Sequence, residues 1–351
     1  MKHFYFILFI ITNIVTAQQI EVVNSLNSPF GMAYKDNYLY MTEWGANKIT
    51  RIDITNPTAS KEDVVVGLNN PISICFIGDK LYIAEYGGGQ ISYVNLTGNP
   101  VLPVSFVVLK TGINFPTDIA TDGVFLYTTD YGNHRVLKID PANASSSTVK
   151  QIYGAFGLTI NNDDIYVSSL LDDKVFKIKT SLGDSQALVT IITSGFDGPG
   201  ALAYKNNKLY IADYVGFKIL KVDLSNIPAL SSTTLLSSPN IYQPGGLLFI
   251  NDDLYFSEVN ASKISKLPSS TLSTENLTLQ NFSVYPNPAN KNIQVQTIEE
   301  IKELSIYTIL GKKVLQTNQK YINVSTLTNG LYLLKVHTYN GKTGIKKFIK
   351  Q

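Results

Sequence analysis

The stretch LYIADYVGFKILKV at residues 209–222 recurs, with changes, at five other places in the chain. The other copies are LYMTEWGANKITRI at 39–52, LYIAEYGGGQISYV at 81–94, LYTTDYGNHRVLKI at 126–139, IYVSSLLDDKVFKI at 165–178 and LYFSEVNASKISKL at 254–267. Successive tyrosines of this phrase lie 42, 45, 39, 44 and 45 residues apart. Such a period, with strand-like alternation, is typical of β-propeller blades. The sequence therefore predicts an all-β fold that contains a six-bladed β-propeller.

Each repeat predicts four short strands, because alternating apolar and polar residues fit half-buried antiparallel strands. The first, innermost strands begin at Pro29, Pro71, Pro116, Ala155, Pro199 and Pro244. The last repeat lacks a fourth strand, whereas the segment IEVVNSL from Ile20 supplies a matching one at the N-terminus. We therefore expect the N-terminal strand to complete the last blade, which leaves only short outer edges exposed.

The chain is predicted to have four parts: a signal peptide at 1–17, the propeller at 18–268, a linker at 269–280 and a C-terminal domain at 281–351. The first part has a basic start at Lys2, an apolar run to about Val15 and a small residue at Ala17, which is the pattern of a secretory signal. No other stretch predicts a membrane span. About seven short alternating strands with Gly/Asn turns predict a small, Ig-like β-sandwich for the C-terminal domain.

Charge and cysteine content narrow the class of protein. Residues 281–351 hold ten Lys and three Glu, a balance of +7, whereas the rest of the chain has a balance of −5. Neither value predicts nucleic-acid binding, which needs a dense basic face. Cys75 is the only cysteine, so an internal disulfide is impossible, and its apolar setting predicts a buried structural thiol.

An acidic residue follows the tyrosine of the phrase by three positions in five repeats, at Glu43, Glu85, Asp130, Asp213 and Glu258. The fourth repeat has Ser169 instead, and a cation five residues further on occurs at Lys48, Arg135, Lys174, Lys218 and Lys263. Regular recurrence favours a structural role, in which the acid holds the loop between the second and third strands by ion pairs and backbone hydrogen bonds. We expect these pairs to be exposed and to contribute about 0–1 kcal/mol each.

The candidate ligand-binding residues lie in loops that a propeller brings to one face. The residue after the acid is aromatic in four repeats, and an Asn or Asp lies two residues before the proline of four inner strands; these residues are Trp44, Tyr86, Tyr131, Tyr214, Asn27, Asn69, Asn114 and Asp197. Amides, carboxylates and aromatic rings together predict contact with a sugar, or with Ca²⁺ at the channel mouth. The alternative is that Asn-x-Pro is ordinary turn chemistry and that the aromatic rings pack between blades.

Asp118 is the one acidic residue at the third position of an inner strand, where the other repeats have Gly31, Ser73, Gly157, Ala201 and Gly246. It is predicted to be either a solvated carboxylate in the central channel or a contact for an ion or ligand. The sequence contains no GxSxG, HExxH or paired-cysteine motif, so no catalytic residue and no resident cofactor is assigned.

The third repeat, PTDIATDGVFLYTTDYGNHRVLKID, resembles an NHL repeat, and the first, LYMTEWGANKITRIDI, resembles the YWTD repeat of receptor propellers. Both belong to a broad group of six-bladed propellers that includes the gluconolactonase-like lactonases. The resemblance implies a structural role for the recurrent acid. The lactonase branch also implies a divalent metal bound by Glu, Asn and Asp around the channel, for which Asp118, Asn114 and Asp197 are the possible ligands here.

The segments FSVYPNPANKNIQVQ from Phe282, IKELSIYTILGKKVLQ from Ile301 and INVSTLTNGLYLLKVHTYNGKT from Ile322 resemble a type IX secretion sorting domain, type A. This resemblance implies a Bacteroidetes-type bacterium and passage through the periplasm and across the outer membrane. It further implies recognition by the type IX machinery and removal of the domain, with release of the protein or its anchoring at the surface.

From these features we expect a secreted or cell-surface propeller that serves as a non-catalytic binding scaffold for a glycan or a protein. A metal-dependent lactonase or other hydrolase is the main alternative, and a structural surface protein without a small ligand is a third.

Overall fold

The structure is a computed structural model that describes residues 19–56, 58–179, 189–194, 196–225, 232–272, 279, 282–309, 311–339 and 343–351. The predicted signal peptide lies outside these ranges, as do residues 273–278 and 280 of the predicted linker. The chain divides into two compact units, of which the first ends at Leu272. Each unit is described by itself.

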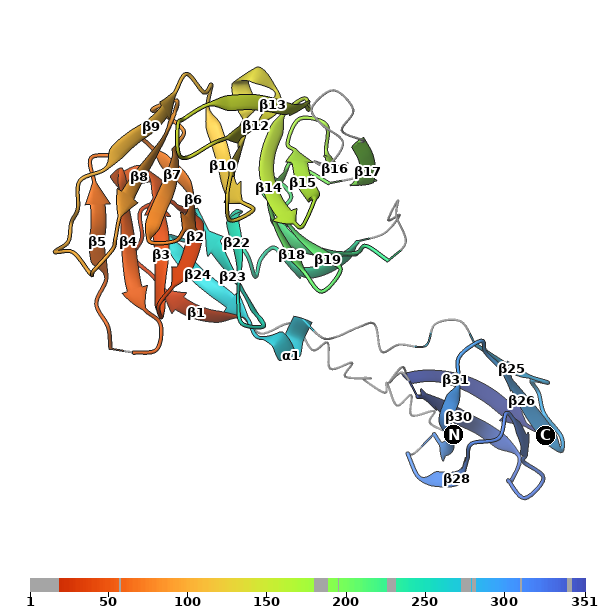
Figure 1. Ribbon diagram of the computed structural model, residues 1–351. Helices are drawn as coiled ribbons and strands as arrows, with labels where there is room; N and C mark the ends of the chain where they lie inside the picture. Colours follow the sequence, from red (N-terminus) through yellow and green to blue (C-terminus); the bar gives the residue numbers. More distant parts are fainter. Residues whose placement is uncertain are drawn as a thin grey trace, which may run out of the picture. The chain divides into compact units, whose positions relative to one another are not determined.

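The first unit is a β-propeller of six four-stranded sheets, counted over the described residues (Figure 1). Blade 1 consists of β2 (Pro29–Lys35), β3 (Tyr38–Glu43), β4 (Lys48–Asp53) and β5 (Glu62–Val66). Blade 2 consists of β6 (Pro71–Ile77), β7 (Lys80–Glu85), β8 (Gln90–Asn95) and β9 (Val107–Thr111). Blade 3 consists of β10 (Pro116–Thr121), β11 (Leu126–Asp130), β12 (Arg135–Ile139) and β13 (Ser146–Gln151).

The remaining blades follow the same order from the channel outward. Blade 4 consists of β14 (Ala155–Asn161), β15 (Asp164–Ser169), β16 (Lys174–Lys179) and β17 (Val189–Ser194). Blade 5 consists of β18 (Pro199–Lys205), β19 (Lys208–Asp213), β20 (Lys218–Asp223) and β21 (Thr233–Ser237). Blade 6 consists of β22 (Pro244–Ile250), β23 (Asp253–Glu258), β24 (Lys263–Leu267) and the N-terminal strand β1 (Ile20–Val23).

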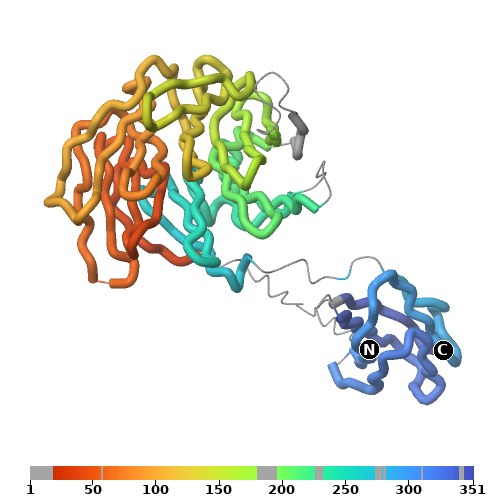
Figure 2. The backbone as a smooth tube through the Cα atoms, viewed as in Figure 1, coloured from red at the N-terminus to blue at the C-terminus, as the bar shows by residue number. Residues whose placement is uncertain are grey.

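The ring of blades closes through its N-terminus, as the sequence predicts. Strand β1 pairs antiparallel with β24, with Ile20 opposite Lys266, and Figure 2 shows the red N-terminal segment beside the cyan segment of blade 6. Val23 and Leu26 are buried in one cluster with Ile264. The N-terminal segment therefore covers the edge of β24 with hydrogen bonds and fills a hydrophobic site.

The propeller unit extends four residues past its expected end at 268. The short helix α1 (Ser269–Leu272) follows β24, and the Leu272 side chain is buried with Ile241 and Phe256. The Lys221 ammonium group also donates a hydrogen bond of 3.1 Å to the Leu272 carbonyl. These contacts attach the helix to blades 5 and 6.

The repeated phrase forms the second and third strands of each blade, and its first half lies in the second strand, which neighbouring blades cover on both faces. In β3, for example, Leu39, Tyr40 and Met41 are all buried, as are the six tyrosines of the phrase, each at most 6% exposed. Complete burial of such side chains contributes about 1.5–3 kcal/mol each. The recurrence of the phrase therefore reflects the core between blades.

Neighbouring inner strands approach each other closely, backbone against backbone. A Cβ atom at Gly31 would lie 2.6 Å from the Ser73 Cα of the next blade, and one at Gly246 would collide with the Phe30 carbonyl. A hydroxyl near the end of the second strand links blades at these points: in blade 4, Ser168 accepts from the Gly157 N–H (2.8 Å) and donates to the Gly200 carbonyl (2.6 Å). Small residues at this position thus allow blades to touch.

The second unit is a β-sandwich, as predicted. One sheet contains β25 (Ser283–Tyr285), β26 (Asn292–Gln296) and β29 (Tyr321–Asn323). The other contains β28 (Lys313–Thr317), β27 (Ile301–Thr308), β30 (Gly330–Thr338) and β31 (Thr343–Lys350). Its core is a single cluster that includes Ile293, Ile306, Leu334 and Phe348. In the described ranges, no helix is long and apolar enough to span a membrane.

Candidate functional site

The recurrent acids form a buried layer beneath one face of the propeller. We call this face the loop face, because it carries the loops between second and third strands and the loops that precede the inner strands. The acid layer consists of Glu43, Glu85, Asp130, Asp213 and Glu258, each at most 4% exposed. This burial contradicts the expectation of exposed ion pairs, because the second strands lie between blades rather than at the surface.

Each acid accepts a hydrogen bond from the backbone N–H of the residue 16 positions earlier, in the loop before the inner strand. The donors and acceptors are Asn27 and Glu43 (2.8 Å), Asn69 and Glu85 (2.8 Å), Asn114 and Asp130 (2.8 Å), Asp197 and Asp213 (3.0 Å), and Tyr242 and Glu258 (3.3 Å). A hydrogen bond to a charged acceptor contributes about 1.5–3 kcal/mol. The acid layer therefore holds the loops of the loop face in place.

The cations contact the acids unevenly. Arg135 donates to Asp130 at 2.7 Å, whereas the ammonium groups of Lys263 and Lys48 lie 3.4 Å and 3.9 Å from Glu258 and Glu43. In blade 4, the Ser169 hydroxyl donates to the Tyr153 carbonyl (2.6 Å) and accepts from the Asp172 N–H (3.1 Å). A neutral side chain thus holds the loop of blade 4.

Whether the acid is a glutamate or an aspartate correlates with the type of side chain seven positions later in the chain. The three glutamates precede Thr50, Ser92 and Ser265, whereas the two aspartates precede Leu137 and Leu220. Ser92 and Ser265 donate to the acids of their own blades. A glutamate is long enough to reach this hydroxyl, and the shorter aspartate leaves the site to an apolar side chain. This correlation is visible in the sequence but was not part of our prediction.

The aromatic residues that follow the acids lie half-buried at the loop face. We call Trp44, Tyr86, Tyr131 and Tyr214 the aromatic rim. Trp44 contacts Tyr86 (5.8 Å between centroids) and Phe30 (5.4 Å), and Phe30 in turn stacks on Tyr214 (5.8 Å). These contacts join rings of blades 1, 2 and 5, so the rim combines packing between blades with partly open ring surfaces.

The predicted amides and carboxylate of the loop face are exposed. Asn27, Asn69, Asn114 and Asp197 all have exposed side chains. The first three lie against the glycine of their own blade's neighbouring loop, so that a Cβ atom at Gly45, Gly87 or Gly132 would collide with the amide. Each amide thus stays with its own blade.

The sequence analysis missed exposed aromatic residues of this face, at Phe115, Tyr153, Phe217 and Tyr242. Phe115 precedes the inner strand of blade 3, is 43% exposed and stacks on Tyr86 with ring centroids 4.8 Å apart. Its φ of +57° is a left-handed conformation, which costs a residue other than glycine about 1–2 kcal/mol. The signal was present, because the corresponding positions of other blades hold Ser28, Asn70, Gly154, Gly198 and Gln243.

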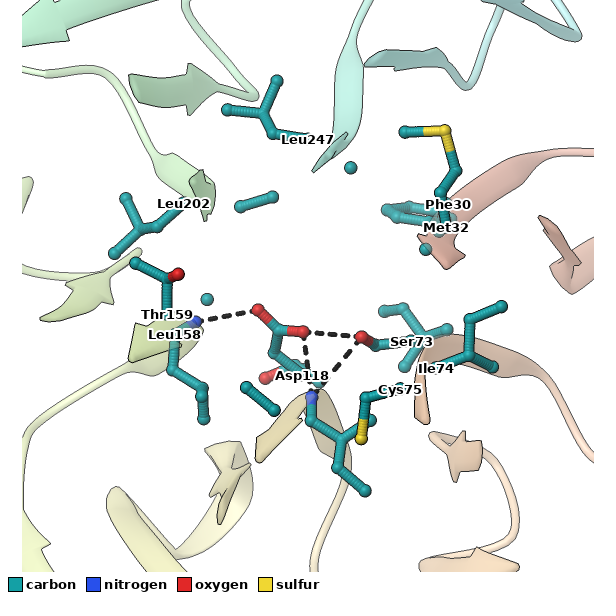
Figure 3. Close-up of a pocket in the computed structure, with 18 of the residues that line it drawn as sticks. Phe30, Met32, Ser73, Ile74, Cys75, Asp118, Leu158, Thr159, Leu202 and Leu247 are labelled. Atoms are coloured by element: carbon teal, nitrogen blue, oxygen red, sulfur yellow. Dashed lines mark hydrogen bonds between the residues drawn. The ribbon is translucent and has the colours of Figure 1, made fainter. Parts of the chain in front are cut away.

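The central channel contains a cavity of about 200 Å³ lined by inner-strand residues, and Asp118 points into it (Figure 3). One carboxylate oxygen of Asp118 accepts from the Ser73 hydroxyl (2.6 Å) and the Ile119 N–H (2.8 Å). The other accepts from the Leu158 N–H at 2.8 Å. The carboxylate therefore links blades 2, 3 and 4, which neither sequence interpretation foresaw.

Desolvation raises the pKa of several groups of the propeller. It raises the pKa of Asp118 to about 6, against the opposing effect of its three hydrogen bonds. Desolvation, and secondarily the charge of Asp118, raises the pKa of the Cys75 thiol, which lines the cavity and is half-buried rather than buried as predicted. In the acid layer, desolvation raises the pKa of Asp213 to about 6, against the opposing effects of the hydrogen bond from the Asp197 N–H and of the Lys218 charge.

Among the residues that the structure describes, no group of three or more His, Cys, Asp or Glu side chains could hold a metal ion. Asp118 lies in the channel, whereas Asn114 and Asp197 lie in loops of different blades.

The C-terminal unit shows that this propeller protein is exported. Residues 283–351 match the family model described as "Secretion system C-terminal sorting domain". This domain marks the chain for the type IX secretion machinery and for export to the cell surface or beyond.

Solved structures are similar to the chain in fold. Virginiamycin B lyase from Staphylococcus aureus has 16% identity and a TM-score of 0.52, over 71% of this chain and 97% of that one. A streptogramin B lyase has 15% identity and a TM-score of 0.53, over 72% and 96%. A chain of a nidogen/laminin complex has 14% identity and a TM-score of 0.52, over 69% and 85%. No match in sequence was found among curated proteins.

Proposed function

We propose that this protein is a non-catalytic binding protein of the cell surface or the secreted fraction, and that its loop face binds carbohydrate. The observation that carries this proposal is the combination of half-buried aromatic rings and exposed amides on one face. Aromatic rings give a sugar an apolar stacking surface, and amides both donate and accept hydrogen bonds. A protein ligand is the other binding outcome that the experiment below can reveal.

The hydrogen bonds of Asp118 support binding rather than catalysis. Three donors already occupy this carboxylate, and it connects inner strands of three blades. A group in such a structural role is poorly suited to exchange protons with a substrate, because each exchange would disturb the contact between blades.

A metal-dependent lactonase or other hydrolase is the second candidate. One observation favours it: Asp118, whose pKa is raised to about 6, lies beside a cavity. A carboxylate that titrates near neutral pH has the proton affinity expected of a general base.

The proposal is tested with the chain from Gln18 to Gln351 in affinity gels that contain soluble polysaccharides, with and without calcium. Trp44 is the only tryptophan of the chain, so its fluorescence reports directly on ligand at the rim. We expect retardation by at least one polysaccharide, and at least about tenfold weaker binding for Trp44→Ala/Tyr214→Ala. Leu171→Ala is the control, because Leu171 is a 45% exposed, non-aromatic residue of the same face.

Full binding by a folded double variant would show that the aromatic rim is not the site. Turnover of lactones that requires added divalent metal and disappears in Asp118→Asn would establish the hydrolase instead. Capture of a protein ligand by the rim, without retardation by any polysaccharide, would keep the binding role and reject carbohydrate.

A further inference from the structure

The left-handed backbone conformation of Phe115 is shared with its counterparts in every other blade. Positive φ values at this position occur at Ser28, Asn70, Phe115, Gly154, Gly198 and Gln243. The loop before the inner strand therefore requires this conformation, which Gly and Asn adopt most easily. A phenylalanine there is strained, and its ring is 43% exposed rather than buried in the core. Packing in the core therefore does not account for the aromatic residue.

The Phe115 ring is only partly covered by its neighbours, since 43% of the residue is exposed. The ring stacks on Tyr86, at 4.8 Å between centroids and an interplanar angle of 24°. The loop that follows Tyr86 is Gly87-Gly88-Gly89, which has no side chains to cover the two rings. Blade 2 thus supports the Phe115 ring through Tyr86, and the exposed part of the ring is available to a ligand.

Neutral amides occur in the loops that carry this pair of rings. The side-chain oxygens of Asn69 and Asn70 lie against Gly87, and Asn114 is the neighbour of Phe115 in the chain. Neutral amides donate and accept hydrogen bonds without favouring a charged ligand. A stacking surface flanked by such groups matches a sugar ring, which has an apolar C–H face and hydroxyl groups around its edge.

We infer that Phe115, supported by Tyr86, forms the sugar-stacking subsite of the propeller, and that the ligand is a neutral polysaccharide whose pyranose ring lies on Phe115 between the amides of blades 2 and 3. This inference rests on the proposed carbohydrate-binding function and names its subsite and ligand class. The strain at Phe115 is retained because the ring serves binding, as strained residues at functional sites commonly do.

The chain contains a matched control for this strain. Phe217 in blade 5 also has a left-handed conformation, with φ of +50°, and is 38% exposed. It occupies the loop between the second and third strands, where other blades hold Asn47, Gly89, His134, Asp173 and Ser262. An asparagine at either position relieves the same kind of strain, but only Phe115 belongs to the inferred subsite.

The experiment compares Phe115→Asn and Phe217→Asn in the chain from Gln18 to Gln351. The probes are β-glucan, xylan and galactomannan as neutral polysaccharides and alginate as a polyanion, in affinity gels. Both variants should melt about 2–4 °C higher than the wild type, because each loses a strained residue. Phe115→Asn should bind the neutral polysaccharide about tenfold more weakly, and Phe217→Asn should bind it within about twofold of the wild type.

Wild-type affinity in Phe115→Asn, or an equal loss in Phe217→Asn, would overturn the inference, and so would a preference for alginate. If Trp44→Ala/Tyr214→Ala loses binding while Phe115→Asn keeps it, the subsite is wrong and the proposed function stands. If the wild type binds none of the polysaccharides, both fail together. Phe115→Leu, which keeps the bulk and the strain but lacks the ring, should lose affinity without gaining stability.

Discussion

The acid layer and the aromatic rim are one residue apart in the sequence and yet differ in almost every physical respect. Glu85 is 1% exposed and accepts a hydrogen bond from the Asn69 N–H, whereas Tyr86 is half-buried and stacks on Phe115. The acid recurs in five of six blades with one hydrogen-bonding partner at a fixed separation of 16 residues. The aromatic residue recurs in four.

In a repeat protein, structural residues can be told from functional ones by how many repeats share a contact. A contact that every blade makes in the same way serves the ring as a whole, because each blade must attach to the next. Features confined to one or two blades, such as Phe115 and the glycine loop of blade 2, have no such use. They are therefore the better candidates for ligand contact, even though the acids look more like catalytic groups.

The largest expected effect on stability comes from comparing a substitution in the acid layer with one in the aromatic rim of the same blade. Asp130→Ala removes the acceptor of the Asn114 N–H and of the Arg135 side chain in a fully buried site. We expect a loss of about 3 kcal/mol of unfolding free energy, because the buried donors lose their partner. Tyr131→Ala should cost less, about 1.5 kcal/mol, because that ring is only partly buried and leaves no buried polar group unpaired.

Both values follow from denaturant unfolding monitored by the fluorescence of Trp44, which reports on the propeller alone because the C-terminal domain has no tryptophan. Asp130→Asn is the control, since it keeps the size of the side chain and one acceptor oxygen, and it should lie between the two. Equal costs for Asp130→Ala and Tyr131→Ala would mean that the rim is part of the core and that the two layers do not differ.

A change in pH is expected to have a smaller effect on stability, through the Asp118 carboxylate that connects three blades. The pKa of Asp118 is raised to about 6, above its ordinary value of 3.8. Between these values the folded state binds more protons than the unfolded state, so this group makes stability fall as pH rises from about 4 to about 6. The contribution is at most about 3 kcal/mol, from 1.36 kcal/mol per pKa unit.

The measurement is the difference in unfolding free energy between the wild type and Asp118→Asn as a function of pH. Asp213, whose pKa is also raised to about 6, is present in both proteins and cancels. As pH rises from about 4 to about 6, the unfolding free energy of the wild type should fall relative to that of Asp118→Asn. A flat or oppositely sloped difference would show that the hydrogen bonds of Asp118, rather than its desolvation, dominate its titration.

Much of the fold could be predicted from the sequence, because its causes are local or periodic. The spacing of the LY phrase predicts the blades, and the missing last strand predicts the pairing of β1 with β24, which the structure confirms. The burial of the acids was predicted wrongly, because polarity suggested the surface while the phrase lies between two blades. The close approach of Gly31 to Ser73 depends on how neighbouring blades pack, which a single repeat does not reveal.

The site was less accessible to sequence reasoning. The partners of Asp118 are 45 and 40 residues away, and their meeting depends on the register between blades. By contrast, the exceptional position of Phe115 can be found by aligning the six repeats, and so can the correlation between glutamate and a hydroxyl seven residues later. The sequence interpretation used the positions that recur in all repeats, whereas both of these features lie at positions where the repeats differ.

The smallest expected effect tests that correlation within the acid layer. Ser92 donates to Glu85, whereas the equivalent hydroxyl of Thr50 and the Oε1 atom of Glu43 are buried without a hydrogen-bonding partner among the described residues. Ser92→Ala should therefore cost about 1 kcal/mol, the usual net value of a hydrogen bond. Thr50→Val should be neutral or stabilising, because it replaces an unpaired buried hydroxyl with a methyl group of the same shape. Denaturant midpoints from Trp44 fluorescence resolve the two, and a loss in Thr50→Val equal to that in Ser92→Ala would show that blade 1 uses the same hydrogen bond as blade 2.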